Sequence, residues 1–113
     1  MSKREAKFLV EDMRAAMGKI ARYIDGMSRE DFLLDERTVD AVVRNLEIIG
    51  EAAKQLPSEY RARSPGIPWT QMAGMRNRIV HDYAGVDLEI VWEVVTKALP
   101  DLERMIVGLE PQG

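Results

Sequence analysis

The residues best suited to chemistry stand close together, between positions 76 and 83. Arg76 is followed after a gap of four residues by His81, the only histidine in the 113-residue chain, and then by Tyr83. Cleavage of RNA without a metal ion requires a base for the 2′-hydroxyl, an acid for the leaving 5′-oxygen and positive charge near the phosphate. Histidine changes its charge near neutral pH, and arginine binds a phosphate through two parallel hydrogen bonds. The types and spacing of these residues therefore indicate RNA cleavage.

A single histidine per chain cannot easily act as base and acid in one step. A symmetric dimer with both copies of the segment at its two-fold axis would supply two histidines and two arginines to a shared cleft. On an α-helix, Arg76 and His81 would lie roughly 140° apart around the axis and about 7.5 Å apart along it. A site that also uses Tyr83 therefore needs either a helix that loosens near Asp82 or a second subunit.

The same residues also have a purely structural interpretation. A lone histidine near a helix C-terminus commonly places a favourable charge at the negative end of the helix dipole. Tyr83 could likewise be an ordinary half-buried packing residue. Residue chemistry alone leaves both interpretations open.

The motif and its flanks resemble the signature of the HEPN superfamily, in the branch of HepT toxins. The matching positions are Arg76, His81 and Tyr83, and the flanks are residues 68–75, residues 85–92 and the earlier segment 44–52. The resemblance extends from about residue 5 to about residue 108. It implies an all-α fold, an up-and-down helical bundle of four main helices plus a short one, assembled as a homodimer with a composite site.

By this resemblance, the chain would be the toxin of a type VII-like toxin–antitoxin pair and a metal-independent endoribonuclease without a cofactor. Arg76 and His81 would be catalytic, with Asn77 and Tyr83 in supporting roles. Tyr83 would also be the site at which a nucleotidyltransferase antitoxin adds AMP units, whose charge and bulk would obstruct the RNA cleft. The alternative function is a noncatalytic helical dimer that binds nucleotide or a partner protein through the same basic groove.

Charge is distributed unevenly along the chain. The formal net charge is −3, yet the segment from Lys54 to His81 holds five basic residues and one acid. A basic patch on an acidic protein can hold phosphates locally without strong nonspecific binding. Arg61, Arg63 and Arg78 are therefore candidate RNA contacts, although solvated surface charge is the simpler explanation for a connecting segment.

Composition and length predict one soluble domain over residues 1–113, with a frayed tail at 109–113. Hydrophobic residues make up 46% and charged residues 31% of the chain, which is ordinary for a globular protein. No apolar run approaches the roughly 20 residues of a membrane span, and the charged N-terminus has no signal core, so we expect a cytoplasmic protein. The absence of cysteine excludes disulfides and thiolate metal sites.

Apolar periodicity predicts a helix over residues 4–25, a short helix after Ser28 and a helix over 36–56. Residues 57–68 contain three prolines and predict a loop, followed by a motif helix that runs from Pro68 to Ala84. Asp87 should cap a last helix, which Pro100 should kink or split. We expect the whole of 32–34 to anchor in the core, and Gly74 to permit close packing of helices.

The predicted helix at 36–56 is more apolar than one neighbouring helix can cover. Its apolar stripe is broadened by Ile48 and Ala52, which fits a central place in the bundle or a subunit contact. Glu47 and Glu51 lie one turn apart and could form a carboxylate pair for metal or acid–base work. Solvated charge, or pairing with Arg44 or Lys54, explains them more simply.

Overall fold

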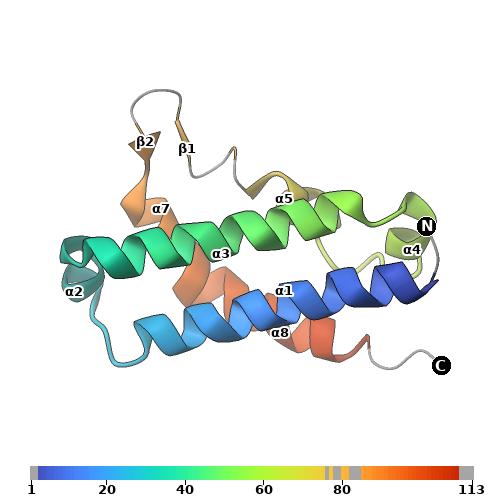
Figure 1. Ribbon diagram of the computed structural model, residues 1–113, viewed down its shortest axis with the longest axis horizontal. Helices are drawn as coiled ribbons and strands as arrows, with labels where there is room; N and C mark the ends of the chain where they lie inside the picture. Colours follow the sequence, from blue (N-terminus) through green and yellow to red (C-terminus); the bar gives the residue numbers. More distant parts are fainter. Residues whose placement is uncertain (1–2, 76, 78–79, 82–84, 110–113) are drawn as a thin grey trace.

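The computed structural model describes residues 3–75, 77, 80–81 and 85–109, with the backbone alone at 3, 4, 80, 81 and 86. Two long antiparallel helices, α1 (Lys3–Ile24) and α3 (Glu36–Gln55), lie side by side and form one layer (Figure 1). Their bounds confirm the helices predicted at 4–25 and 36–56. The all-α bundle predicted from the sequence is likewise confirmed.

The short helix α2 (Arg29–Leu34) connects the two long helices through local hydrogen bonds. Gly26 ends the preceding turn with a φ of 77°, a backbone conformation that favours glycine. The Ser28 hydroxyl then accepts a hydrogen bond from the Asp31 N–H, and the Asp31 carboxylate accepts one from the Ser28 N–H, both at 3.1 Å. This reciprocal cap is the one that the sequence predicts.

The expectation that all of residues 32–34 anchor in the core is wrong for Leu34. Phe32 is fully buried, whereas 87% of the Leu34 side chain is exposed. Residues two positions apart on a helix point about 200° apart around its axis, so α2 cannot direct the side chains of both Phe32 and Leu34 into one core.

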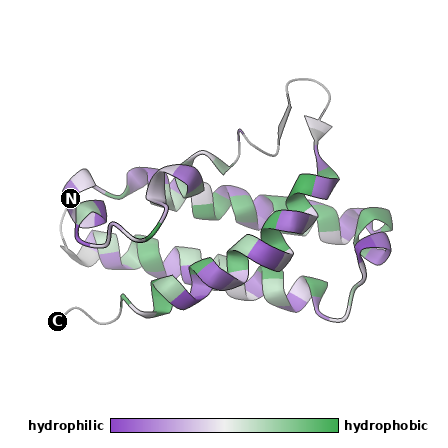
Figure 2. Cartoon of the chain, turned by 180° about the vertical axis from the view of Figure 1, so that it is seen from behind, coloured by the Kyte–Doolittle hydropathy of each residue, from purple (hydrophilic) through white to green (hydrophobic). Residues whose placement is uncertain are grey.

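The second layer is a continuous helical run that crosses α1 and α3, behind them in Figure 1 and in front of them in the reverse view of Figure 2. It consists of α7 (Leu88–Glu93), the π-helical turn η2 (Val94–Ala98) and α8 (Leu99–Val107). Pro100 lacks an N–H group and crowds the carbonyl one turn before it. The Leu99 N–H accordingly donates to the Val94 carbonyl, five residues back. The interruption predicted at Pro100 is therefore confirmed, as a widened turn.

The segment predicted as a loop, residues 57–68, contains a short helix, α4 (Ser58–Ala62). The extended Pro57 ends α3, and its carbonyl accepts hydrogen bonds from the Tyr60 and Arg61 N–H groups at 3.0 and 3.1 Å. Pro57 and Pro65 thus stand on either side of a short helix, and the prediction of a loop is wrong for residues 58–62.

The predicted motif helix is shorter than expected. Helix α5 (Trp69–Ala73) is followed by helical geometry at residues 75 and 77, but β1 (Val80–His81) is extended and pairs antiparallel with β2 (Gly85–Val86). The prediction of a helix to Ala84 is therefore wrong at His81. Gly85 adopts a φ of 88°, which lets the backbone meet β1.

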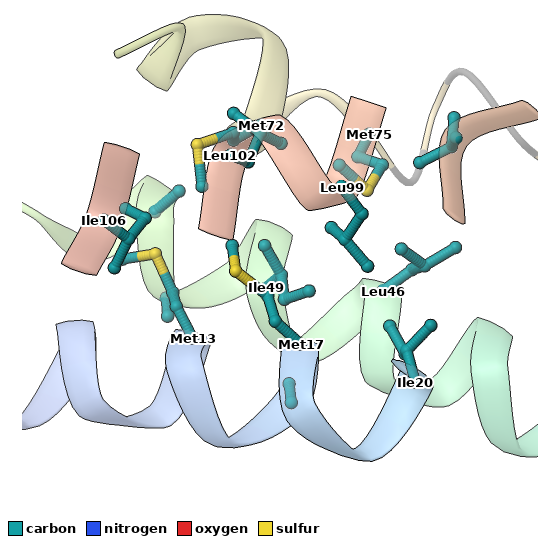
Figure 3. Close-up of a cluster of buried hydrophobic side chains, with 14 of the residues drawn as sticks. Met13, Met17, Ile20, Leu46, Ile49, Met72, Met75, Leu99, Leu102 and Ile106 are labelled. Atoms are coloured by element: carbon teal, nitrogen blue, oxygen red, sulfur yellow. The ribbon is translucent and has the colours of Figure 1, made fainter. Parts of the chain in front are cut away.

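The core lies between the two layers. Figure 3 shows its centre, where side chains from α1, α3 and α8 meet those of α5 and of Met75 just after it. The labelled members are Met13, Met17, Ile20, Leu46, Ile49, Met72, Met75, Leu99, Leu102 and Ile106. Two large apolar side chains on the helices remain half exposed, Phe8 at 49% and Met105 at 43%. None of the helices in the described ranges is long and apolar enough to cross a bilayer.

Candidate active site

His81 lies on a short hairpin that projects from the edge of the bundle. Its backbone pairs with Gly85, and Val80 pairs with Val86. Figure 1 shows the hairpin rising beyond α3 and leading directly into α7. His81 therefore occupies the end of a strand, and does not lie at the C-terminus of a helix.

Only one of the other predicted residues in the motif, Asn77, is among the described residues. Asn77 is helical and exposed. Arg76, Arg78 and Tyr83 lie outside the described residues. The structure thus describes the backbone of His81, which is extended, and Asn77, which is helical.

The segment that leads into the motif is fixed to the core. Met72 is 1% and Met75 is 6% exposed, and both side chains enter the cluster between α3 and α8 (Figure 3). A Cβ atom on Gly50 of α3 would stand 3.1 Å from the Met72 carbonyl oxygen. Glycine at position 50 therefore lets α5 rest directly on α3.

This close approach was predicted at the wrong glycine. At Gly74 a Cβ atom would meet the Thr70 and Gln71 carbonyl oxygens at 3.5 and 3.9 Å, which are ordinary contacts within its own turn. Gly50 was missed, although a glycine inside a helix costs about 1 kcal/mol relative to alanine and so calls for a packing reason. The energetic cost of a glycine inside the predicted helix was the signal in the sequence that could have identified Gly50 as a packing site.

The far end of the motif segment is fixed by the start of α7. The Asp87 carboxylate accepts hydrogen bonds from the N–H groups of Glu89 and Ile90 at 3.1 and 3.2 Å, as its predicted cap role requires. The Trp92 ring packs on Phe32 with centroids 5.2 Å apart. An ion pair between Arg29 and Glu89 adds a second link from α2 to α7. Both ends of the motif segment are thus held by packed elements.

The basic residues of α4 lie at the other end of the bundle from the hairpin (Figure 1). The Arg63 guanidinium stands 5.7 Å from the centre of the Tyr60 ring, and that ring meets Trp69 edge-on at 6.4 Å. Arg61 is half-buried, and its Nε atom is buried without a hydrogen-bond partner. Within one chain, the structure does not bring Arg61 and Arg63 together with His81.

Glu47 and Glu51 are a carboxylate pair that α3 carries one turn apart. Within the described ranges, no three histidine or acidic side chains cluster as metal ligands would. Glu51 is exposed and forms no ion pair with Arg44 or Lys54 in that part of the chain, so pairing, one of the two simpler explanations, does not apply to it. Solvated charge is the state that the structure gives to this residue.

Comparison with known proteins finds close relatives over almost the whole chain. The sequence profile described as Ribonuclease HepT-like matches residues 13–108. A probable ribonuclease HepT of Thermococcus cleftensis is 42% identical over 101 residues, 89% of this chain and 92% of the relative. A protein of Caldanaerobacter subterraneus named as a candidate RNase is 41% identical over 102 residues, 90% of this chain and 81% of the relative. No solved structure matches the chain.

Proposed function

Because the chain belongs to the Ribonuclease HepT-like family, we propose that it is a metal-independent endoribonuclease whose catalytic residues are Arg76 and His81. One His81 takes the proton of a ribose 2′-hydroxyl, and the oxygen attacks the adjacent phosphorus. The bond to the 5′-oxygen breaks, and the His81 of a second subunit donates a proton to that leaving oxygen. Arg76 holds the phosphate as its charge develops.

The observation that carries this proposal is the place of His81. A stabilising charge at a helix C-terminus was the structural alternative for this residue, and His81 lies instead on β1. The only histidine of the chain thus stands on a projecting hairpin anchored at both ends. Such a position supports a role in chemistry, and Asn77, exposed on the approach to the hairpin, is suited to contact a phosphate or the His81 ring.

Further parts of the proposal concern substrate and control. Arg61, Arg63 and Arg78 bind phosphates of the RNA chain away from the cleaved bond. Tyr83 follows His81 by two residues, so AMP units added there by a nucleotidyltransferase antitoxin would place negative charge beside the histidine and repel RNA. In this scheme the protein is a toxin of the type VII-like class, active as a homodimer until Tyr83 is modified.

The test is cleavage of RNA by the purified protein in excess chelator, with its intact mass recorded to establish that Tyr83 is unmodified. We expect fragments that end in 2′,3′-cyclic phosphate, and resistance of the same RNA carrying 2′-O-methyl groups. His81→Ala and Arg76→Ala should each lose at least about 100-fold in rate. Arg104→Ala, which removes an exposed arginine from α8, is the matched control and should cleave normally.

Two results would contradict the proposal. Full activity of His81→Ala would remove the histidine from the mechanism. Absence of cleavage by the folded, unmodified protein on RNAs of varied sequence, together with retained RNA or nucleotide binding, would identify a noncatalytic binding dimer.

A further inference from the structure

Four side chains between α3 and α5 form one surface group, which we call the α4 platform. Its members are Tyr60 and Arg61 on α4, Arg63 at the C-cap of that helix, and Trp69 at the start of α5. Trp69 is 5% exposed, the half-buried Tyr60 ring meets it edge-on, and the exposed Arg63 guanidinium stands over the Tyr60 ring. The group therefore extends from the core to the solvent and ends in a planar cation.

The α4 platform is held in place by local hydrogen bonds. The Arg63 N–H donates to the Tyr60 carbonyl at 3.2 Å, and the Ser64 N–H donates to the Arg61 carbonyl at 3.1 Å. The indole N–H of Trp69 donates to the Ser64 carbonyl, also at 3.1 Å. The backbone that carries both arginines is thus tied to a buried ring, so a ligand that binds them has little of the segment left to order.

The charge of the α4 platform is not neutralised by its surroundings. Glu59 is the only acidic residue between positions 52 and 81. Among the described residues, neither Arg61 nor Arg63 has an ion-pair partner, whereas Arg104 pairs with Asp101. The buried Nε atom of Arg61 also has no hydrogen-bond partner there, and a buried donor in that state calls for an explanation. An anionic ligand would supply the missing acceptor.

We propose that the α4 platform is a nucleobase subsite for single-stranded RNA. A base stacks on the outer face of the Arg63 guanidinium, whose inner face already covers Tyr60, and Arg61 receives a phosphate of the same strand. The choice of RNA as ligand rests on the proposed function, and stacking gives Arg63 a role beyond its phosphate contact. Unpaired bases stack readily on aromatic rings and guanidinium planes. A duplex keeps its base faces covered, so the subsite selects single strands.

The α4 platform lies at the other end of the bundle from the hairpin that carries His81 (Figure 1). The molecule is 43 Å long, and at about 3.4 Å per stacked nucleotide a strand of about 13 nucleotides spans it. Within one chain, the stacked base is therefore remote from the cleaved bond. The subsite contributes affinity for the strand and takes no part in proton transfer.

The test is binding of a single-stranded 2′-O-methyl RNA, which lacks the attacking hydroxyl, measured by fluorescence anisotropy with a strand of about 20 nucleotides. Arg63→Lys keeps the charge and removes the planar guanidinium. We expect it to raise Kd about tenfold, the effect of losing one stacked base, with an unchanged dependence on salt. Tyr60→Leu should weaken binding similarly, and Tyr60→Phe, which keeps the ring, should bind like the wild type.

A strand of the same length without bases separates stacking from charge. It should bind the wild type and Arg63→Lys equally, because only phosphates remain to be contacted. Arg104→Ala, which removes an exposed arginine from α8, is the matched control and should bind both strands normally. Circular dichroism checks the fold of each variant.

Three outcomes would overturn the subsite. They are wild-type affinity of Arg63→Lys for the strand with bases, an abasic strand that still distinguishes this variant from the wild type, and a wild type that binds neither strand. Cleavage of unmethylated RNA is a separate measurement. A protein that shows the stacking pattern without cleaving RNA keeps the subsite and refutes the ribonuclease, whereas cleavage together with normal binding by Arg63→Lys keeps the ribonuclease and refutes the subsite.

Discussion

The substitution Gly50→Ala tests how directly the fold positions the motif. An added Cβ atom would stand 3.1 Å from the Met72 carbonyl oxygen and 3.7 Å from that of Ala73. Both atoms belong to the backbone, so α5 must move by a few tenths of an ångström. Crowding of this kind typically costs about 1–3 kcal/mol, while replacing a helical glycine with alanine returns about 1 kcal/mol. The expected net change in the free energy of unfolding is a loss of about 1 kcal/mol.

Gly18→Ala on α1 is the matched control. Its new Cβ atom would meet only the flexible end of the Arg22 side chain at 3.6 Å, so the helix gains its usual stability of about 1 kcal/mol. The two variants should therefore differ by about 2 kcal/mol in urea unfolding followed by circular dichroism. RNA cleavage should fall about tenfold or more in Gly50→Ala, because the displaced α5 carries the residues that lead into Arg76, and should be unchanged in Gly18→Ala. If Gly50→Ala gains as much stability as Gly18→Ala, the close approach of α5 to α3 is wrong.

The remaining predictions concern the core and the caps. Phe32→Ala removes a fully buried ring that packs on Trp92 and should cost about 3–5 kcal/mol in unfolding free energy, with a change in tryptophan fluorescence. Met75→Ala empties a site in the core directly before the motif and should cost about 2–4 kcal/mol, measured by urea unfolding, with a loss of cleavage beyond the unfolded fraction. Hydrogen bonds from the backbone and hydroxyl of Thr38 hold the pKa of Asp35 below its usual 3.8. The ionised form therefore stabilises the fold above that value and this contribution disappears as the pH falls through the folded pKa, so Asp35→Asn should lose less stability than the wild type between pH 5 and pH 3.

Elements whose borders depend on neighbouring residues could be predicted from the sequence. The reciprocal cap of Ser28 and Asp31, the Asp87 cap and the interruption before Pro100 all follow from groups within five residues of one another. Apolar periodicity likewise located α1 and α3 to within one residue at each end. Such features need no knowledge of the rest of the chain.

The features that the sequence did not predict depend on distant partners. Val80 and His81 are extended and pair with Val86 and Gly85, in a hairpin whose ends are fixed by packed elements, and a run of helix formers before the motif gives no sign of this geometry. The exposure of Phe8 and Leu34 depends on which faces α7 and α8 cover. The role of Gly50 depends on the path of a segment more than twenty residues later. Periodicity states that a face is apolar, but only the tertiary arrangement decides what covers it.

The hairpin that carries His81 cannot be stabilised by its own pairing. Two strands of two residues form too few contacts to persist in water, since even longer isolated hairpins are marginal. Its geometry must come from its anchors, Met72 and Met75 on one side and Asp87 with Trp92 on the other. In the proposed homodimer, the His81 residues of two subunits serve one cleft, so association would add a third constraint. The cleavage rate per chain should therefore depend on protein concentration even where the fold is fully formed. It should fall at protein concentrations below the Kd of the dimer, with no change in circular dichroism. A cleavage rate per chain that stays constant across that range would show that one subunit suffices.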